Sequence, residues 1–300
     1  MVHADKDLNL GILGMSEGNG HPYSWAAICN GYDPVALAAC GFPAIPAYLA
    51  ERKFPEDQLP GVRVTHVWTQ SGELSRHIAS ASRIERVCEK PEDMIGQVDG
   101  ILLARDDAEN HLRFASPFLR AGLPVYVDKP FALSSRNATL LWNEAANPEQ
   151  IFTCSALYFS SEILPAEELS KIGKIRSVHA MTPKTWNTYG AHIVDPVLRV
   201  LGDLGAPVVI GVFSRNGANH LIVEFKNGPV VHFEATGRAN SSIQFHFTGE
   251  HGELTTVFRD SFTAFRSALA AFRDQIQLER QIIPRLHVER VVSLLEAGCG

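Results

Sequence analysis

The first half of the chain alternates short apolar runs with longer stretches of helical periodicity. Strands that alternate with helices in this way are typical of a parallel sheet covered by helices. The pattern therefore predicts an α/β fold with a Rossmann-type, doubly wound parallel sheet. Strands are expected at residues 8–13, 62–68, 84–87, 99–104, 123–127 and 151–157, and helices at 23–30, 111–121 and 134–146.

The second half has a different pattern, in which apolar runs follow one another at short spacing. Strands are expected at residues 208–213, 220–225, 230–236 and 243–249, and Asn227-Gly228 between two of them is a hairpin signal. Closely spaced strands joined by turns favour an antiparallel sheet. With helices at 258–278 and 285–295, we expect an α+β domain with an open, mostly antiparallel sheet over 158–300, after a first domain over 1–157.

The charge of the chain limits its partners. There are 27 Lys and Arg residues against 33 Asp and Glu, which gives a formal net charge of −6. Such a chain has no general attraction to nucleic acid or to anionic lipid, and no apolar run approaches the roughly 20 residues that span a bilayer. Residues 1–7 are polar, unlike a signal peptide. We therefore expect neither nucleic acid nor a membrane as a partner.

The five cysteines are far apart and form no Cys-x-x-Cys pair. This usage fits a reducing cytoplasm and argues against both a disulfide scaffold and a structural zinc site. The 12 histidines form no His-Glu-x-x-His or His-x-His cluster along the sequence, so a metal site is possible but unsupported and none is assigned.

A glycine-rich segment follows the first predicted strand. A dinucleotide site needs glycines at a strand-to-helix turn, where the backbone approaches a pyrophosphate and helix N–H groups are free. That position is occupied by Gly14, Ser16, Gly18, Gly20 and His21. Their spacing is not a strict Gly-x-Gly-x-x-Gly. They are candidate cofactor-binding residues. A plain tight turn, with His21 only starting a helix, is the alternative.

The end of the second predicted strand bears on the choice between NAD and NADP. An acidic residue there would bind the ribose 2′-hydroxyl of NAD. The strand instead runs into Thr69, and no carboxylate occurs before Glu73, whereas Arg76 and His77 follow closely. This favours NADP over NAD as the cofactor, with Thr69 as a candidate ligand, unless Arg76 and His77 are only solvated loop residues. Residues 33–61, with five prolines, are predicted to be an insertion.

Asp128-Lys129-Pro130 directly follows the fifth predicted strand. In a doubly wound sheet the carboxyl ends of the strands line the ligand crevice, so this lysine could hold a substrate hydroxyl and take its proton as hydride leaves. The alternative is a surface lysine in a turn.

Three segments resemble the motifs of the Gfo/Idh/MocA oxidoreductase family, in the same order. Residues 128–132 resemble its Glu-Lys-Pro motif, residues 99–104 followed by His111 resemble the preceding strand and helix, and residues 189–195 resemble its histidine motif. The resemblance covers nearly the whole chain. It implies an N-terminal dinucleotide-binding domain, a C-terminal domain for substrate binding and oligomerisation, and hydride transfer between NAD(P) and a carbinol carbon of a sugar, polyol or sugar derivative.

The resemblance also assigns catalytic residues. Lys129 would polarise the substrate oxygen, and His192 would act as general acid or base, for which its ordinary pKa suits neutral pH. The family's aspartate four residues before this histidine is Thr188 here, and a hydroxyl cannot replace a carboxylate as a base. Tyr189 would compensate as a hydrogen-bonding phenol. Asp195 would orient His192, or only cap or solvate its helix.

After the fourth strand the family's Thr-Pro pair is replaced by Arg105-Asp106, which we expect beside the cofactor. Two alternatives to a dehydrogenase remain open: a hydrolase or isomerase that uses the cofactor transiently, and a nucleotide- or sugar-sensing partner protein without catalysis. Family members commonly pair through the open sheet, which predicts a homo-oligomer, a dimer or tetramer. The apolar residues expected on its open face, which a partner subunit would cover, are Ile222, Val223, Phe225, Val231, Phe233, Phe245 and Phe247.

Overall fold

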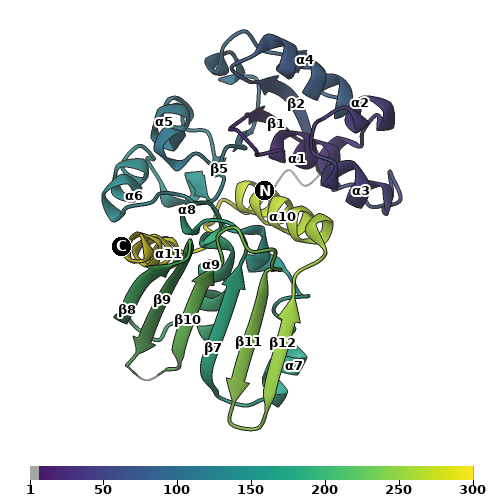
Figure 1. Cartoon of the computed structure of the whole chain (residues 1–300). Helices are drawn as coiled ribbons and strands as arrows, with labels where there is room; N and C mark the ends of the chain where they lie inside the picture. Colours follow the sequence, from purple (N-terminus) through teal and green to yellow (C-terminus); the bar gives the residue numbers. More distant parts are fainter. Residues whose placement is uncertain (1–6, 227, 300) are drawn as a thin grey trace. The chain divides into compact units, whose positions relative to one another are not determined.

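The computed structural model describes residues 7–226 and 228–299, and this part of the chain contains two six-stranded sheets (Figure 1). Residues 1–6 of the polar N-terminal segment, and Asn227 of the hairpin signal, lie outside the described residues. No helix within the described ranges is both long enough and apolar enough to cross a membrane.

The first sheet is parallel throughout, as predicted, with the strand order β3-β2-β1-β4-β5-β6. This is the order of a Rossmann fold. Its central strands are buried, which explains why they are apolar without alternation. The strands are β1 (Leu8–Leu13), β2 (Val62–Trp68), β3 (Arg86–Val87), β4 (Gly100–Leu103), β5 (Val125–Val127) and β6 (Ile151–Phe152).

Local sequence signals explain several helix starts around this sheet. Asp33 accepts a hydrogen bond from the N–H of Ala36, and Ser71 accepts one from Leu74, so both side chains cap helices. The predicted insertion contains α2 and α3. The helices are α1 (His21–Asn30), α2 (Pro34–Ala38), α3 (Ala44–Ala50), α4 (Gly72–Ala81), α5 (His111–Arg120) and α6 (Ser135–Trp142), with short 3₁₀ turns at η1 (Pro91–Met94), η2 (Ala108–Asn110) and η3 (Pro148–Gln150).

The second sheet has the order β12-β11-β7-β10-β9-β8. It is mixed and mostly antiparallel, as predicted; the exception is the central pair, β7 and β10, which run parallel. The strands β7 and β12 were not predicted. The strands are β7 (Ile175–Thr182), β8 (Pro207–Arg215), β9 (Ala218–Phe225), β10 (Val230–Ala235), β11 (Gln244–Gly249) and β12 (Glu253–Val257).

The apolar residues of this sheet do not cover an open face, contrary to the prediction. Six of them are at most 2% exposed and form a core with residues of α9 and α11: Val223, Phe225, Val231, Phe233, Phe245 and Phe247. Only Ile222 of the predicted set lies outside this core, because side chains alternate between the two faces of a strand. The remaining elements are η4 (Ala156–Phe159), α7 (Ala166–Lys171), α8 (Trp186–Tyr189), α9 (Ala191–Leu201), α10 (Ser261–Leu278) and α11 (Arg285–Gly298).

The chain forms two compact units that are not contiguous in sequence. The first contains the chain up to Asp128, residues 139–153 and residues 265–283; the second contains residues 129–138, 154–264 and 284–300. The predicted single boundary at 157/158 differs from this division because most of α10 packs in the first unit. There Phe272 contacts Tyr126 and Phe152, and the amide of Gln275 donates to the carbonyl of Ile151.

Candidate active site

The glycine loop after β1 is shaped by close packing at both ends. A Cβ on Gly14 would lie 2.4 Å from Cγ of Pro22, and a Cβ on Gly20 would lie 2.6 Å from Cδ1 of Ile45. Both distances are below what real contacts allow, so only glycine fits at these two positions without a shift of Pro22 or Ile45. Between them Gly18 has φ +76°, a conformation that favours glycine.

The loop offers backbone donors. Within the described residues, the N–H groups of Ser16, Glu17 and Gly18 have no hydrogen-bond partner, whereas the N–H of Asn19 is bound to the carbonyl of Ser16. Successive unpaired N–H groups before a helix form a site for a phosphate group. The loop therefore fits the pyrophosphate of a dinucleotide.

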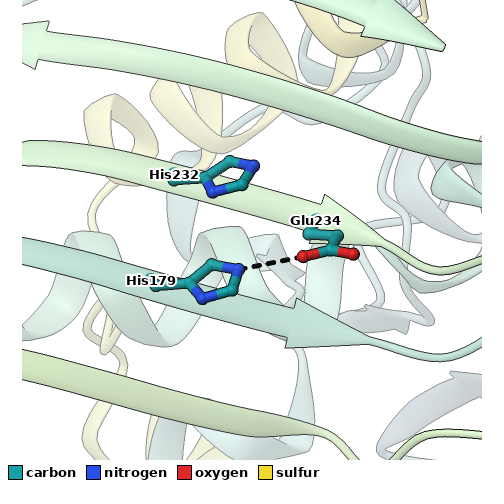
Figure 2. A group of neighbouring side chains, drawn as sticks. All are labelled: His179, His232 and Glu234. Atoms are coloured by element: carbon teal, nitrogen blue, oxygen red, sulfur yellow. Dashed lines mark hydrogen bonds and ion pairs between the residues drawn. The ribbon is translucent and has the colours of Figure 1, made fainter. Parts of the chain in front are cut away.

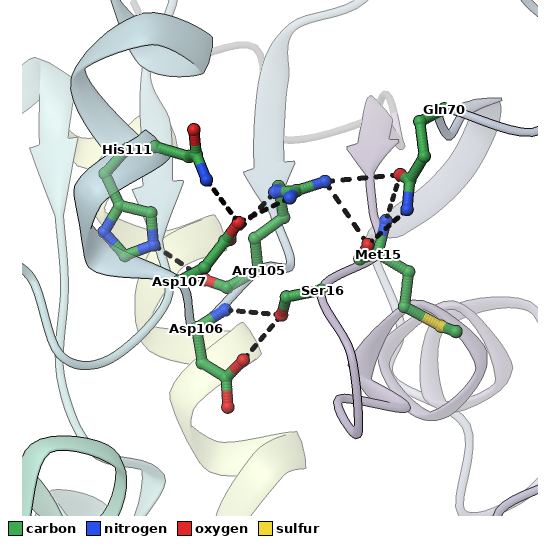
Figure 3. Close-up of polar contacts among 8 residues, drawn as sticks. Met15, Ser16, Gln70, Arg105, Asp106, Asp107 and His111 are labelled. Atoms are coloured by element: carbon green, nitrogen blue, oxygen red, sulfur yellow. Dashed lines mark hydrogen bonds and ion pairs between the residues drawn. The ribbon is translucent and has the colours of Figure 1, made fainter.

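Gln70 and Arg105 fix the start of this loop (Figure 3). The amide of Gln70 forms two hydrogen bonds with the backbone of Met15, accepting from its N–H at 3.1 Å and donating to its carbonyl at 2.7 Å. Nη1 of Arg105 donates to the same carbonyl and to Oε1 of Gln70, both at 3.3 Å. The N–H of Met15 is consequently engaged within the protein.

Arg105 is buried and bound to Asp107 through two hydrogen bonds, Nε to Oδ1 at 2.9 Å and Nη2 to Oδ2 at 2.5 Å. Its guanidinium lies 4.7 Å from the ring centroid of Phe114. Burial raises the pKa of Asp107, but hydrogen bonds from Arg105 and Asn110 outweigh burial and leave the pKa below its ordinary value. Arg105, predicted to lie beside the cofactor, thus also has a structural role.

Asp106 contacts the loop directly. The hydroxyl of Ser16 donates to Oδ1 of Asp106 at 2.5 Å and accepts from its backbone N–H at 3.1 Å. Ser16 and Asp106, both predicted as cofactor-binding residues, are therefore brought together. A carboxylate at this position accepts hydroxyl donors and disfavours a phosphate oxygen.

The turn after β2 contains no carboxylate near its start, but Thr69 does not face outward. Thr69 is 3% exposed, and its hydroxyl donates to the carbonyl of Ser71. His77 is also engaged, with Nδ1 2.6 Å from the hydroxyl of Tyr23. The exposed cation near this turn is Arg76 of α4, which forms no hydrogen bond or ion pair with any described residue. A direct role of Thr69 at the cofactor stays a prediction.

His21 is held by the residue before the predicted catalytic lysine. Nδ1 of His21 lies 2.5 Å from Oδ2 of Asp128, and the same oxygen accepts from the side-chain amide of Asn19 at 3.0 Å. The ring of His21 stacks on Trp25, which in turn stacks on Tyr126 of β5. His21 therefore joins the glycine loop to the end of β5; its contact with a cofactor stays a prediction.

In the second unit, the structure brings together three of the four residues predicted for catalysis. Nζ of Lys129 lies 5.7 Å from the ring centroid of Tyr189, and the ring of His192 lies 4.9 Å from the same centroid. Lys129 is 5% exposed, and His192 is half-buried at the start of α9. The hydroxyl of Tyr189 accepts a hydrogen bond from Nζ of Lys184 at 2.8 Å.

Ser155 and His287 belong to this cluster and were missed in the sequence. The hydroxyl of Ser155 lies 2.8 Å from Nδ1 of His192 and accepts from the N–H of Leu157. Buried Asp195 accepts from the N–H of Ser155 at 2.6 Å, and its other oxygen lies 2.6 Å from Nε2 of His287. Asp195 is thus linked to His192 through two hydrogen bonds of Ser155. No signal in the sequence indicated Ser155, because it lies inside the sixth predicted strand.

That strand was predicted over residues 151–157 but ends at Phe152. The backbone N–H of Ser155 is bound by Asp195 instead of a neighbouring strand, and the hydroxyl of Ser155 caps the short helix η4. Because the strand ends before Ser155, the hydroxyl of Ser155 can contact His192.

Thr188, at the family's aspartate position, lies beside a cavity of about 700 Å³. Its hydroxyl is paired with that of Thr185 at 2.8 Å. Among the described residues, the cavity wall includes the cations Lys184 and Arg238 and no carboxylate. Lys184 links the cavity to Tyr189 through the hydrogen bond described above.

Residues 40–155 match the oxidoreductase family with an NAD-binding Rossmann fold that is named GFO_IDH_MocA. Over this part of the chain, the match agrees with the resemblance predicted from the sequence, and the matched family is one of oxidoreductases. No curated protein matches the chain with significance.

Solved structures confirm the fold over the whole chain. One is myo-inositol 2-dehydrogenase from Lactobacillus plantarum, with TM-score 0.74, 13% identity, and 98% of this chain and 96% of that chain covered. GenD2 from gentamicin A biosynthesis, in complex with NAD, has a TM-score of 0.73 and 16% identity, with 99% of this chain and 94% of that chain covered. A 3-ketoreductase from Actinomadura kijaniata, in complex with NADP, has a TM-score of 0.72 and 14% identity, with 97% of this chain and 96% of that chain covered. At these identities the likeness shows the fold alone.

We predict that Arg105→Ala lowers the free energy of unfolding by about 3 kcal/mol, because it leaves the carboxylate of Asp107 half-buried without its partner. The lowered pKa of Asp107 means that this stabilisation is fully present above the ordinary carboxyl pKa and is lost as the pH falls through the folded-state pKa. Urea unfolding at pH 7 and at acidic pH measures both effects. Arg113→Ala is the matched control, because exposed Arg113 also lies near the ring of Phe114; equal losses for both variants would contradict the prediction.

Proposed function

We propose that this chain is an NAD(P)-dependent oxidoreductase that transfers a hydride between nicotinamide and a carbinol carbon of a sugar, polyol or sugar derivative. The observation that supports it best is the grouping of Lys129, Tyr189 and His192, with Ser155 bonded to the histidine. Inositol dehydrogenase and ketoreductase structures share the fold. The match of residues 40–155 supplies the class of reaction.

Lys129 and His192 would divide the proton chemistry. A buried ammonium group stabilises negative charge on a substrate oxygen, so Lys129 is suited to hold the reacting hydroxyl or carbonyl. Since the hydroxyl of Ser155 already accepts from Leu157, its own hydrogen can be donated to Nδ1 of His192. This contact would orient the imidazole for proton exchange with the substrate. Nicotinamide supplies the hydride donor or acceptor when it is bound.

The first unit would hold the cofactor. The N–H groups of residues 16–18 would bind the pyrophosphate, and the carboxylate of Asp106 would accept a ribose hydroxyl. NADP is the preferred form, because the turn after β2 has no carboxylate for a 2′-hydroxyl and presents Arg76. A guanidinium suits a phosphate better than any other side chain does.

The substrate would carry a negative charge. Lys184 and Arg238 give the wall of the cavity beside Thr188 two cations and no carboxylate. The residue that is an aspartate in the family is a neutral threonine here, which removes the repulsion that an acidic substrate would meet. A sugar acid or another carboxylated polyol derivative fits these charges.

Lys129→Ala is expected to lower kcat/KM by about 10²–10⁴-fold, because it removes the group that holds the reacting oxygen. The test follows absorbance of reduced nicotinamide with a panel of neutral and carboxylated polyols, in which we expect the carboxylated members to react faster. Lys174→Ala, at an exposed position of the same unit, serves as the control. Cofactor binding without turnover over the whole panel would instead favour the partner-protein alternative, and substrate conversion without net reduced cofactor would favour the hydrolase or isomerase.

Arg76→Ala is expected to raise the KM for NADP about tenfold and to leave the KM for NAD unchanged, because only NADP carries the 2′-phosphate. Arg86→Ala, on the neighbouring strand β3, is the control. If the two cofactors respond equally to Arg76→Ala, the proposed 2′-phosphate contact is wrong, whereas the oxidoreductase activity itself is unaffected by that outcome.

A homo-oligomer would form through β8, the edge strand of the second sheet. Val208 and Ile210 are 63% and 56% exposed, and exposed apolar residues on an edge strand favour pairing with another chain. We expect a dimer or tetramer in solution, and a shift to the monomer mass in the double variant Val208→Glu, Ile210→Glu. Light scattering at micromolar concentration measures the mass; a monomeric wild type would contradict this part of the proposal.

A further inference from the structure

Several histidines line up on the face of the second sheet that lies opposite its core. The parallel register places His179 of β7 beside His232 of β10, and the antiparallel register places His246 of β11 on the other side of His179. The neighbours of His179 in its own strand, Val178 and Ala180, are buried in the core. The histidines therefore point to the opposite, accessible face, because side chains alternate along a strand.

Glu234 lies two residues after His232 in the same strand and so shares its face. Its Oε2 is 3.0 Å from Nε2 of His179, and the rings of His179 and His232 stack with centroids 4.6 Å apart (Figure 2). Figure 2 shows the three side chains gathered above two neighbouring strands. One ligand atom from each residue lies within 4.8 Å of the other two.

These separations fit a metal ion after small side-chain rotations. Ligands about 2.1 Å from a tetrahedral zinc ion are about 3.4 Å from one another, and the His179–Glu234 pair is already closer than that. Two imidazoles and one carboxylate form a ligand set used for zinc and for other divalent transition metals. The side chains of His179 and Glu234 are 43% and 22% exposed, so an ion can enter from solvent.

His232 also contacts a fourth histidine. Nδ1 of His220 lies 3.1 Å from Nε2 of His232, and a hydrogen bond between two imidazoles requires one unprotonated nitrogen.

A hydrogen-bonded histidine–carboxylate pair is by itself an ordinary cross-strand contact. The same face has a second such pair, in which Nε2 of His246 lies 3.6 Å from Glu253. That pair belongs to no group of three candidate ligands among the described residues, whereas His179 and Glu234 have His232 as a third. The third ligand distinguishes a metal site from a surface ion pair.

We propose that His179, His232 and Glu234 bind one divalent transition-metal ion of the Zn²⁺ class, with its fourth position open to water. The site lies in the second sheet, and none of its residues belongs to the proposed active site. A bound ion would cross-link β7 and β10, the central parallel pair of this sheet. Because the ion binds the folded chain, it would raise the unfolding temperature of the protein.

The test uses the full chain without an affinity tag and Zn²⁺ as the probe. Calorimetry is expected to give one ion per chain, and Co²⁺ in its place is expected to give the intense visible absorption of a four-coordinate site. His179→Gln and His232→Gln should each weaken Zn²⁺ binding at least about tenfold, since a lost ligand should cost no less than a lost outer-shell partner. His246→Gln, one strand away on the same face, should leave the affinity unchanged.

Circular dichroism and the unfolding temperature of each metal-free variant show that it folds, so that lost binding is not lost structure. The proposal is overturned if wild type shows no saturable binding, or if His246→Gln weakens binding as much as His179→Gln does. Either result can be told apart from failure of the proposed oxidoreductase function, because no step of this experiment measures turnover.

Discussion

Parallel pairing of β1 with β2 on one side and with β4 on the other is the constraint on which the candidate cofactor site depends. Strands that run in the same direction deliver the segments that follow them to one edge of the sheet. Met15 and Arg105 are 90 positions apart in the chain, yet they share a hydrogen bond at that edge. Gln70, from the segment after β2, closes the same network. The register of the sheet therefore determines which side chains meet.

The network at this edge follows from the cost of burying a charge. A guanidinium that is removed from water needs partners for its donors, and Asp107, Gln70 and the carbonyl of Met15 provide them for Arg105. The same contacts fix the first residues of the glycine loop. With a net charge of −6, the protein has no overall field to attract an anionic cofactor. In the proposed function, the attraction would come from local groups, namely the unpaired N–H groups of residues 16–18 and the guanidinium of Arg76.

The sequence was sufficient where an element is determined by its own residues. The ranges of β1 and β2 agree with the prediction at both ends, because apolar runs and the turns around them are local signals. The strand β7 was missed, although it lies inside the second sheet, because only Val178, Ala180 and Thr182 of its eight residues are buried. Ser155 and His287 were missed for a different reason: each contacts a residue of α9 that is distant in sequence, and no spacing rule connects them.

The second sheet shows why alternating apolar residues of a strand can be assigned to the wrong face of the sheet. Val231 and Phe233 were expected on an open surface, but they form the core, and His232 and Glu234 take the surface instead. Alternation fixes which residues share a face; only packing against α9 and α11 decides which face is buried. The same limit hid the histidine cluster. Metal-ligand motifs in a sequence are defined by spacing along the chain. His179 and His232 are instead neighbours on two paired strands, which lie about 5 Å apart in the hydrogen-bonding direction. Such a ligand set exists only once the register of β7 against β10 is fixed.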